Sequence, residues 1–205
     1  MGEHPITHNK TESYERLQAL YQMSVELSAL RSLESVLDTA LDHCLSLTGS
    51  QFGFIGLNAT NGKALDVVVI NGFNPSNAFY QHNHLIPLHP NLFARAALES
   101  RAVKTEDAMH DPKRVGQPKD HPPVRTFLGV PLRIRNQPIG MIGLANRPEP
   151  YNDEHEQLLM TCAAQVAIVI RNAQLYEQPS APNEKLEQKV VRRTQQLQVA
   201  KEALA

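Results

Sequence analysis

The stretch VRTFLGVPLRIRNQPIGMIGLA, residues 124–145, predicts two consecutive β-strands. Its apolar residues come in short runs rich in Val, Ile and Phe, which favour extended backbone. We expect strands over 124–135 and 137–145, with Asn136 and its neighbours forming the turn between them. The hairpin indicates that the middle of the chain contributes to a β-sheet.

A long helix is predicted directly after this hairpin, over residues 151–178. Asn152 or Asp153 can cap its first turn. Apolar side chains follow two faces of it, one with Leu159, Cys162, Ala163, Val166 and Ile170 and the other with Leu158, Gln165, Ile168 and Leu175. Two apolar faces predict two neighbours, namely the sheet and another helix.

The residues before the hairpin alternate between helical and extended patterns. A turn at Asn61-Gly62 separates two β-rich runs. The region from Gly72 to Pro90 has no firm period, yet its large apolar side chains predict a loop that folds over something. The elements expected here are helices over 11–30, 33–47 and 90–100, and strands over 51–57, 64–70 and 102–105.

The chain divides into four expected segments, which are a disordered tail over 1–10, one domain over 11–178, a linker over 179–184 and a coiled-coil helix over 185–205. Pro179 and Pro182 end the long helix. The last segment has a seam with heptad spacing, formed by Leu186, Val190, Arg193, Leu197, Ala200 and Leu204. So short a coiled coil predicts docking on a partner.

The charges of the chain nearly cancel, with 20 Lys and Arg against 21 Asp and Glu among 205 residues. This balance argues against nucleic-acid binding and against polybasic attachment to a membrane. No apolar stretch is long enough for membrane insertion, and the polar start of the chain lacks a signal core. The only cysteines, Cys44 and Cys162, form no disulfide or zinc pattern, so we expect a cytoplasmic protein.

Four elements of the sequence together resemble a GAF domain, over about residues 14–177. They are the strand FLGVPL, the strand IGMIGL, an acidic start to the long helix and its ending AIVIRNAQLY. The strand QFGFIGL and the first helices match as well. The tail LEQKVVRRTQQLQVAKEAL is similar to linker helices of bacterial signalling proteins of the sensor histidine kinase or diguanylate cyclase type.

The resemblance implies an α+β, GAF/PAS-like fold with a twisted antiparallel sheet, helices on one face and a ligand pocket on the other. It implies a regulatory sensor of a two-component or related system, and not an enzyme. Ligand occupancy would pass through the terminal helices, which would also form a homodimer, to an output domain outside this chain. A ligand-free dimerisation module is the rival interpretation, and a filled pocket would favour it.

Aromatic residues indicate where that pocket lies, because all the phenylalanines fall between residues 52 and 127. A cavity lined by aromatic side chains under a loop is the usual form of a small-molecule site. The predicted ligand-binding residues are Phe54, Val68, Ile70, Phe73, Phe79, Tyr80, Phe93, His121, Phe127 and Leu144.

The cofactor stays unknown, because GAF relatives use the pocket in several ways. Bilin-binding and methionine-sulfoxide-reducing relatives need a cysteine near the pocket, and neither Cys44 nor Cys162 falls in that half. Cyclic-nucleotide relatives carry an N-K…F…D-E signature, of which Asn146-Arg147…Tyr151…Asp153-Glu154 is an altered form. These two acids are equally explained as first-turn residues favoured by the helix dipole.

Haem is a further use, because the segment DHPPVRTFLG resembles the one that supplies the axial histidine in haem-binding GAF sensors. By that match His121 would ligate the iron. The alternative is a loop histidine that is hydrogen-bonded to the backbone. A metalloenzyme using His82, His84 and His89 is a separate rival, although this segment lacks a nearby carboxylate and polar loop residues explain it as well.

Overall fold

The computed structural model describes residues 16–23, 33–73, 84–117 and 121–177. Contacts divide the chain into two compact units, residues 1–169 and 170–205, and the sheet lies in the first. The predicted tail, linker and coiled coil fall outside the described residues. None of the described helices has the length and apolar character needed to cross a membrane.

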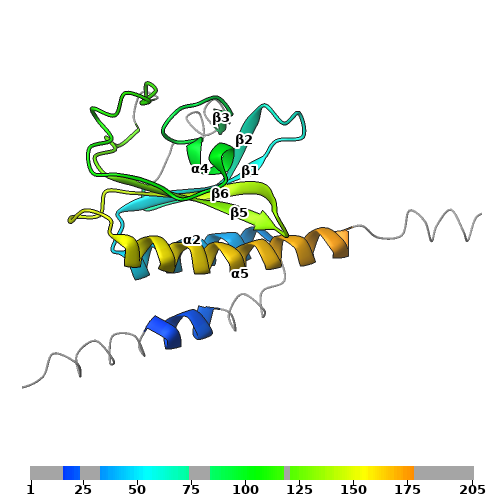
Figure 1. The fold of residues 1–205 in the computed structure, drawn as a ribbon. Coiled ribbons are helices and arrows are strands. Elements are labelled where there is room, and N and C mark those ends of the chain that lie inside the picture. Colours follow the sequence, from blue (N-terminus) through cyan, green and yellow to red (C-terminus); the bar gives the residue numbers. More distant parts are fainter. Residues whose placement is uncertain (1–15, 24–32, 74–83, 118–120, 178–205) are drawn as a thin grey trace, which may run out of the picture. The chain divides into compact units, whose positions relative to one another are not determined.

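A six-stranded antiparallel sheet forms the centre of the first unit, in the order β3-β2-β1-β6-β5-β4 (Figure 1). β1 and β6 are neighbours at its middle, and the predicted hairpin of β5 and β6 is confirmed. The strands are β1 Phe52–Asn58, β2 Ala64–Asn71, β3 Leu85–Pro87, β4 Val103–Thr105, β5 Phe127–Ile134 and β6 Gln137–Ala145.

Two tight turns join the long strands as the sequence predicts. In the turn between β1 and β2, Gly62 has a φ of 64°, and the Asn61 side chain accepts a hydrogen bond from the Lys63 amide at 2.9 Å. Arg135 has a φ of 55° in the turn between β5 and β6. Positive φ values of this kind suit hairpin turns, whose twist matches that of the strands.

Within the first unit, two helices cover one face of the sheet (Figure 1). α2, Leu33–Thr48, contacts β1 and β2. α5, Asp153–Glu177, begins beside α2. The thiols of Cys44 in α2 and Cys162 in α5 are both buried and contact each other. The prediction of a helix that packs on a second helix is therefore confirmed within the first unit.

Two predictions for the opposite face need correction. Residues 85–87, expected in a loop, form β3, which pairs with β2 through Leu65 and Ile86. The helix expected over 90–100 is only α4, Arg95–Glu99, because the Asn91 side chain accepts hydrogen bonds from the amides of Phe93 and Ala94 and forms a turn instead. α4 contacts β5 and β6.

Candidate ligand-binding site

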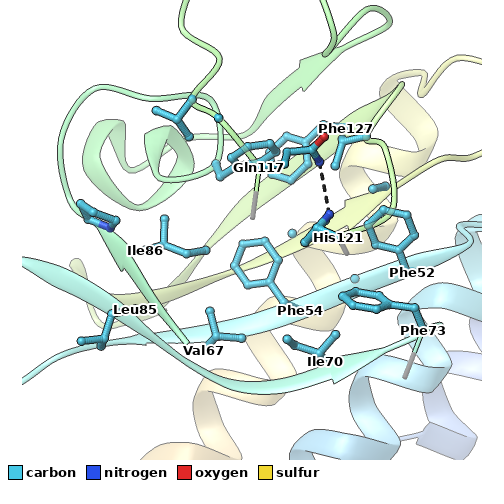
Figure 2. A pocket seen from close by; sticks show the side chains of 18 residues that line it. Phe52, Phe54, Val67, Ile70, Phe73, Leu85, Ile86, Gln117, His121 and Phe127 are labelled. Atoms are coloured by element: carbon cyan, nitrogen blue, oxygen red, sulfur yellow. Dashed lines mark hydrogen bonds between the residues drawn. The ribbon is translucent and has the colours of Figure 1, made fainter. Parts of the chain in front are cut away.

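A cavity of about 200 Å³ lies against the face of the sheet that α4 covers (Figure 2). Residues of β1, β2, β3, β5 and β6 line it. Phe93, just before α4, and residues 115–117, 121 and 124 enclose it further. The cavity therefore lies where the GAF resemblance predicts a ligand pocket.

The floor is formed by aromatic rings that lie over very small residues. The rings of Phe93 and Phe127 meet edge to face, with centroids 5.4 Å apart. The ring of Phe54 lies over Gly143, where an added Cβ would come 2.4 Å from the Phe54 Cε1 atom. Glycine at this position in β6 therefore leaves the space that the ring occupies.

A second aromatic cluster closes one end of the cavity, and Figure 2 shows its three rings together. The centroid of the His121 ring is 5.7 Å from that of Phe52 and 5.2 Å from that of Phe73. Phe52 and Phe73 are themselves 5.5 Å apart in an edge-to-face arrangement. Contacts of this geometry are favourable beyond the area that they bury.

His121 is bonded to the backbone, as the alternative to haem ligation expects. Its Nδ1 atom lies 2.6 Å from the carbonyl oxygen of Pro122, and since a carbonyl only accepts, Nδ1 donates to it. The side-chain nitrogen of Gln117 lies 3.2 Å from His121 Nδ1 and 3.2 Å from the carbonyl oxygen of Pro122, to which it donates a hydrogen bond. Burial lowers the pKa of His121, so the imidazole is uncharged at neutral pH.

Asn146 positions the segment that carries His121. Its side chain accepts a hydrogen bond from the Arg125 amide at 2.8 Å and donates one to the Pro123 carbonyl at 2.9 Å. Its own amide donates to Thr126 at 3.0 Å, and its φ is 60°. In the sequence, Asn146 belongs to an altered form of the cyclic-nucleotide signature. In the structure it bridges backbone groups directly after the end of β6.

Most of the predicted site residues that the structure describes meet in this cavity. Those that line it are Phe54, Ile70, Phe73, Phe93, His121 and Phe127. Val68 and Leu144 do not line it, and Phe79 and Tyr80 lie outside the described residues. Sequence reasoning missed Phe52, which the period of two places on the same face as Phe54, and Gln117, for which the sequence has no signal.

A β-bulge explains why Val67 and not Val68 lines the cavity. Ile55 in β1 is opposite Val69, but the next residue, Gly56, is opposite Val67, so Val68 has no partner. The extra residue shifts the alternation of β2, and Val67 takes the cavity position. Counting alternate residues back from Ile70 therefore selects Val68, whereas Val67 lines the cavity.

Leu144 does not line the cavity for a different reason, which is that successive side chains of β6 point to opposite faces of the sheet. Gly143 and Ala145 line the cavity, so the residue between them faces the other side of the sheet. An added Cβ on Gly53 would contact both Leu144 and Leu41 of α2, which places Leu144 against the helices. It belongs to the core and not to the cavity.

The described lining of the cavity contains no charged side chain. Its polar side chains are His121 and Gln117, and neither cysteine of the chain lines it. No group of three His, Cys, Asp or Glu residues with metal-binding geometry occurs in the part of the chain that the structure describes. His82, one of the three histidines considered for a metal, lies outside those residues.

Comparison with known proteins adds a family match and several related folds. The family model described as GAF domain matches residues 31–171. The GAF domain of a phosphoenolpyruvate-protein phosphotransferase from Acinetobacter is 22% identical, with a TM-score of 0.69, and the match covers 78% of this chain and 95% of that one.

Two further solved structures share the fold at lower identity. A free methionine-R-sulfoxide reductase from Neisseria meningitidis, solved with its substrate, is 15% identical with a TM-score of 0.65, over 78% of this chain and 91% of that chain. Residues 122 to 287 of a methyl-accepting chemotaxis protein are 18% identical with a TM-score of 0.65, over 77% and 99%. At such identities the likeness shows a common fold.

Proposed function

Because the chain belongs to the GAF domain family, whose members are regulatory ligand-binding and signalling domains, we propose that its cavity is the receptor site for a small molecule. The observation that carries this proposal is the cavity itself, with about 200 Å³ of space between aromatic walls. A ligand there would contact the sheet together with residues 115–117 and with His121 and Val124. Binding would therefore favour the conformation in which the two are closed on each other.

A chain of contacts connects this cavity with the start of α5. Phe127, which lines the cavity, pairs with Thr105 in β4. The preceding residue of β4, Lys104, forms ion pairs with Asp153 and with Glu156, the latter at 3.1 Å. We propose that a shift of β5 and β4 on ligand binding passes through these ion pairs to α5.

The receiving partner in this proposal is an output domain of a signalling protein, of the histidine kinase or diguanylate cyclase type. Its basis is the heptad seam over residues 186–204, which also suits a homodimer through the terminal helices. The near-zero net charge and the cysteine usage support a cytoplasmic domain that binds no nucleic acid.

A regulatory role fits the cavity better than an enzymatic one. The chain has two cysteines, and both lie in the buried helix layer. Thiol chemistry of the kind that a sulfoxide reductase performs therefore has no nucleophile at the cavity. The described walls also offer no pair of charged side chains for acid–base chemistry.

Haem does not fit the described cavity. Pockets that enclose drug-sized ligands have volumes of about 300–1,000 Å³, and a tetrapyrrole needs space on that scale. The cavity has about 200 Å³, and the rings of Phe52 and Phe73 contact the His121 imidazole. We expect the purified protein to be colourless, and a Soret band in its absorption spectrum would contradict this.

Hydrogen–deuterium exchange on the full chain tests the receptor proposal. The small-molecule fractions of a cell extract are added in turn to wild type, Val67→Phe and Val68→Phe. Val67 lines the cavity and its neighbour does not, so the two variants form a matched pair.

The proposal predicts that at least one fraction slows exchange in residues 121–134 and at the start of α5. Val67→Phe should lose this effect and Val68→Phe should keep it. A wild-type protein whose exchange no fraction alters would overturn the receptor proposal.

A further inference from the structure

We propose that the cavity selects a neutral aromatic molecule of one or two rings that carries a single hydrogen-bond donor. This inference rests on the proposed function, because it names the chemical class that the receptor site takes. Three properties of the described lining lead to it, which are the volume that it encloses, its lack of charged side chains and the carboxamide oxygen of Gln117.

The volume sets the size of the guest. An engineered cavity of about 150 Å³ with apolar walls takes up benzene. The present cavity, at about 200 Å³, has room for such a ring with a few further atoms. A nucleotide, with a base, a sugar and a phosphate, is too large to be enclosed.

The walls favour a flat, apolar guest. Phe93 presents its ring to Phe127 edge to face, and the ring of Phe54 lies beside them over Gly143. Figure 2 shows Phe54 at the centre of the site, with Ile86 to one side and the ring cluster of Phe52 to the other. A ligand ring inserted there meets the edges and faces of aromatic side chains at favourable geometry.

The absence of charge in the described lining selects against ions. A carboxylate or phosphate that left water for this cavity would find no lysine or arginine in the described lining. Burying an unpaired charge is strongly unfavourable. His121 does not compensate, because burial lowers its pKa and leaves it neutral at pH 7.

Gln117 supplies the hydrogen-bonding preference. Its side-chain nitrogen donates to the Pro122 carbonyl at 3.2 Å, which orients the carboxamide. The oxygen of the same group accepts no hydrogen bond from the described residues, and Gln117 lines the cavity. A hydroxyl or ring N–H on the ligand would complete it.

Three fluorinated probes that share one ring test the class on the full chain by ¹⁹F NMR. They are 4-fluorophenol, which carries the donor, 4-fluoroanisole, which lacks it, and 4-fluorobenzoate, which is an anion. We expect 4-fluorophenol to bind, 4-fluoroanisole to bind at least about threefold more weakly, and 4-fluorobenzoate about 100-fold more weakly.

Variants locate the binding in the cavity. Gln117→Leu should abolish the preference for the phenol over the anisole while leaving the ring bound. Val67→Phe should abolish binding of all probes, and Val68→Phe should not. Circular dichroism checks that each variant is folded, and Ile70→Phe replaces Val67→Phe if the latter fails this check.

The outcomes separate this inference from the receptor proposal. Tighter binding of 4-fluorobenzoate than of 4-fluorophenol, lost in Val67→Phe, would overturn the ligand class and keep the receptor. So would extract fractions that slow exchange when none of the three probes binds at millimolar concentration. Failure of both the probes and the extract fractions would overturn the receptor proposal as well.

Discussion

Gly143 is the residue on which the open cavity most depends. Because an added Cβ would come 2.4 Å from the Phe54 ring, Gly143→Ala should push that ring into the cavity. We expect a loss of about 1–3 kcal/mol in the free energy of unfolding, as is usual for overpacking, together with weaker binding of 4-fluorophenol. Urea denaturation and ¹⁹F NMR measure the two effects.

Gly116 provides the matched control for this substitution. It also lines the cavity, but an added Cβ there has nothing within 4 Å. Gly116→Ala should therefore leave the free energy of unfolding close to that of wild type. Equal losses in the two variants would contradict the overpacking explanation.

His121 makes the stability of the domain depend on pH. Burial lowers its pKa in the folded protein, so the unfolded chain binds the proton more readily. The stabilisation is complete above the unfolded pKa of about 6.5 and is lost as the pH falls through the lowered folded value. The free energy of unfolding should therefore decrease between pH 7.5 and pH 5.

Removing the titrating group tests this assignment. His121→Gln should reduce the decrease, whereas His89→Gln, at a residue that does not line the cavity, should not. His155, whose pKa burial also lowers, accounts for part of the remaining slope. Urea denaturation at several pH values gives the comparison, and an unchanged slope in His121→Gln would exclude its role.

At the scale of elements, hydroxyl groups connect the end of α2 with the residues before α5. Thr48 Oγ1 is 2.7 Å from Ser50 Oγ, which is 2.8 Å from the hydroxyl of Tyr151. Burial raises the pKa of Tyr151 to about 12, so the group stays protonated. This chain of bonds fixes where the two helices of one layer meet.

Tyr151→Phe removes one bond of this chain and leaves the ring in place. We expect a decrease of about 1 kcal/mol in the free energy of unfolding, measured by urea denaturation. Thr161→Val, which removes an exposed hydroxyl bonded only within α5, serves as control and should cost less. A larger loss in the control would contradict the importance of the connection.

The elements also show how far the sequence predicts this fold. The strands β5 and β6 and the helix α5 were predictable because long apolar patterns and a tight turn define them locally. β3 was not, because its three residues become a strand only by pairing with β2. The bulge at Val68 was equally hidden, since it depends on the register between β1 and β2.

The residues of the candidate site likewise fall into those that the sequence predicts and those that it does not. The rings of Phe54, Phe93 and Phe127 were predictable as pocket residues from their concentration in one half of the chain. The positioning role of Asn146 was not, because its three backbone partners lie some twenty residues earlier in the sequence. Polar bridges between loops leave no periodic signal.

At the scale of the whole molecule, the heptad tail predicts self-association. Light scattering on the full chain at high concentration should give the mass of a dimer. Leu197→Lys, at a seam position, should shift the mass toward the monomer, and Gln198→Lys, beside the seam, should not. A wild-type chain that remains monomeric at high concentration would contradict the predicted dimer.

The central claim is that the cavity on the sheet face under α4 has room for a ligand. A crystal structure of the full chain under xenon pressure tests this most directly, because xenon enters apolar cavities of this size. We expect xenon density among Phe54, Ile86 and Phe93. A site filled by the protein's own side chains, with no xenon, would contradict it.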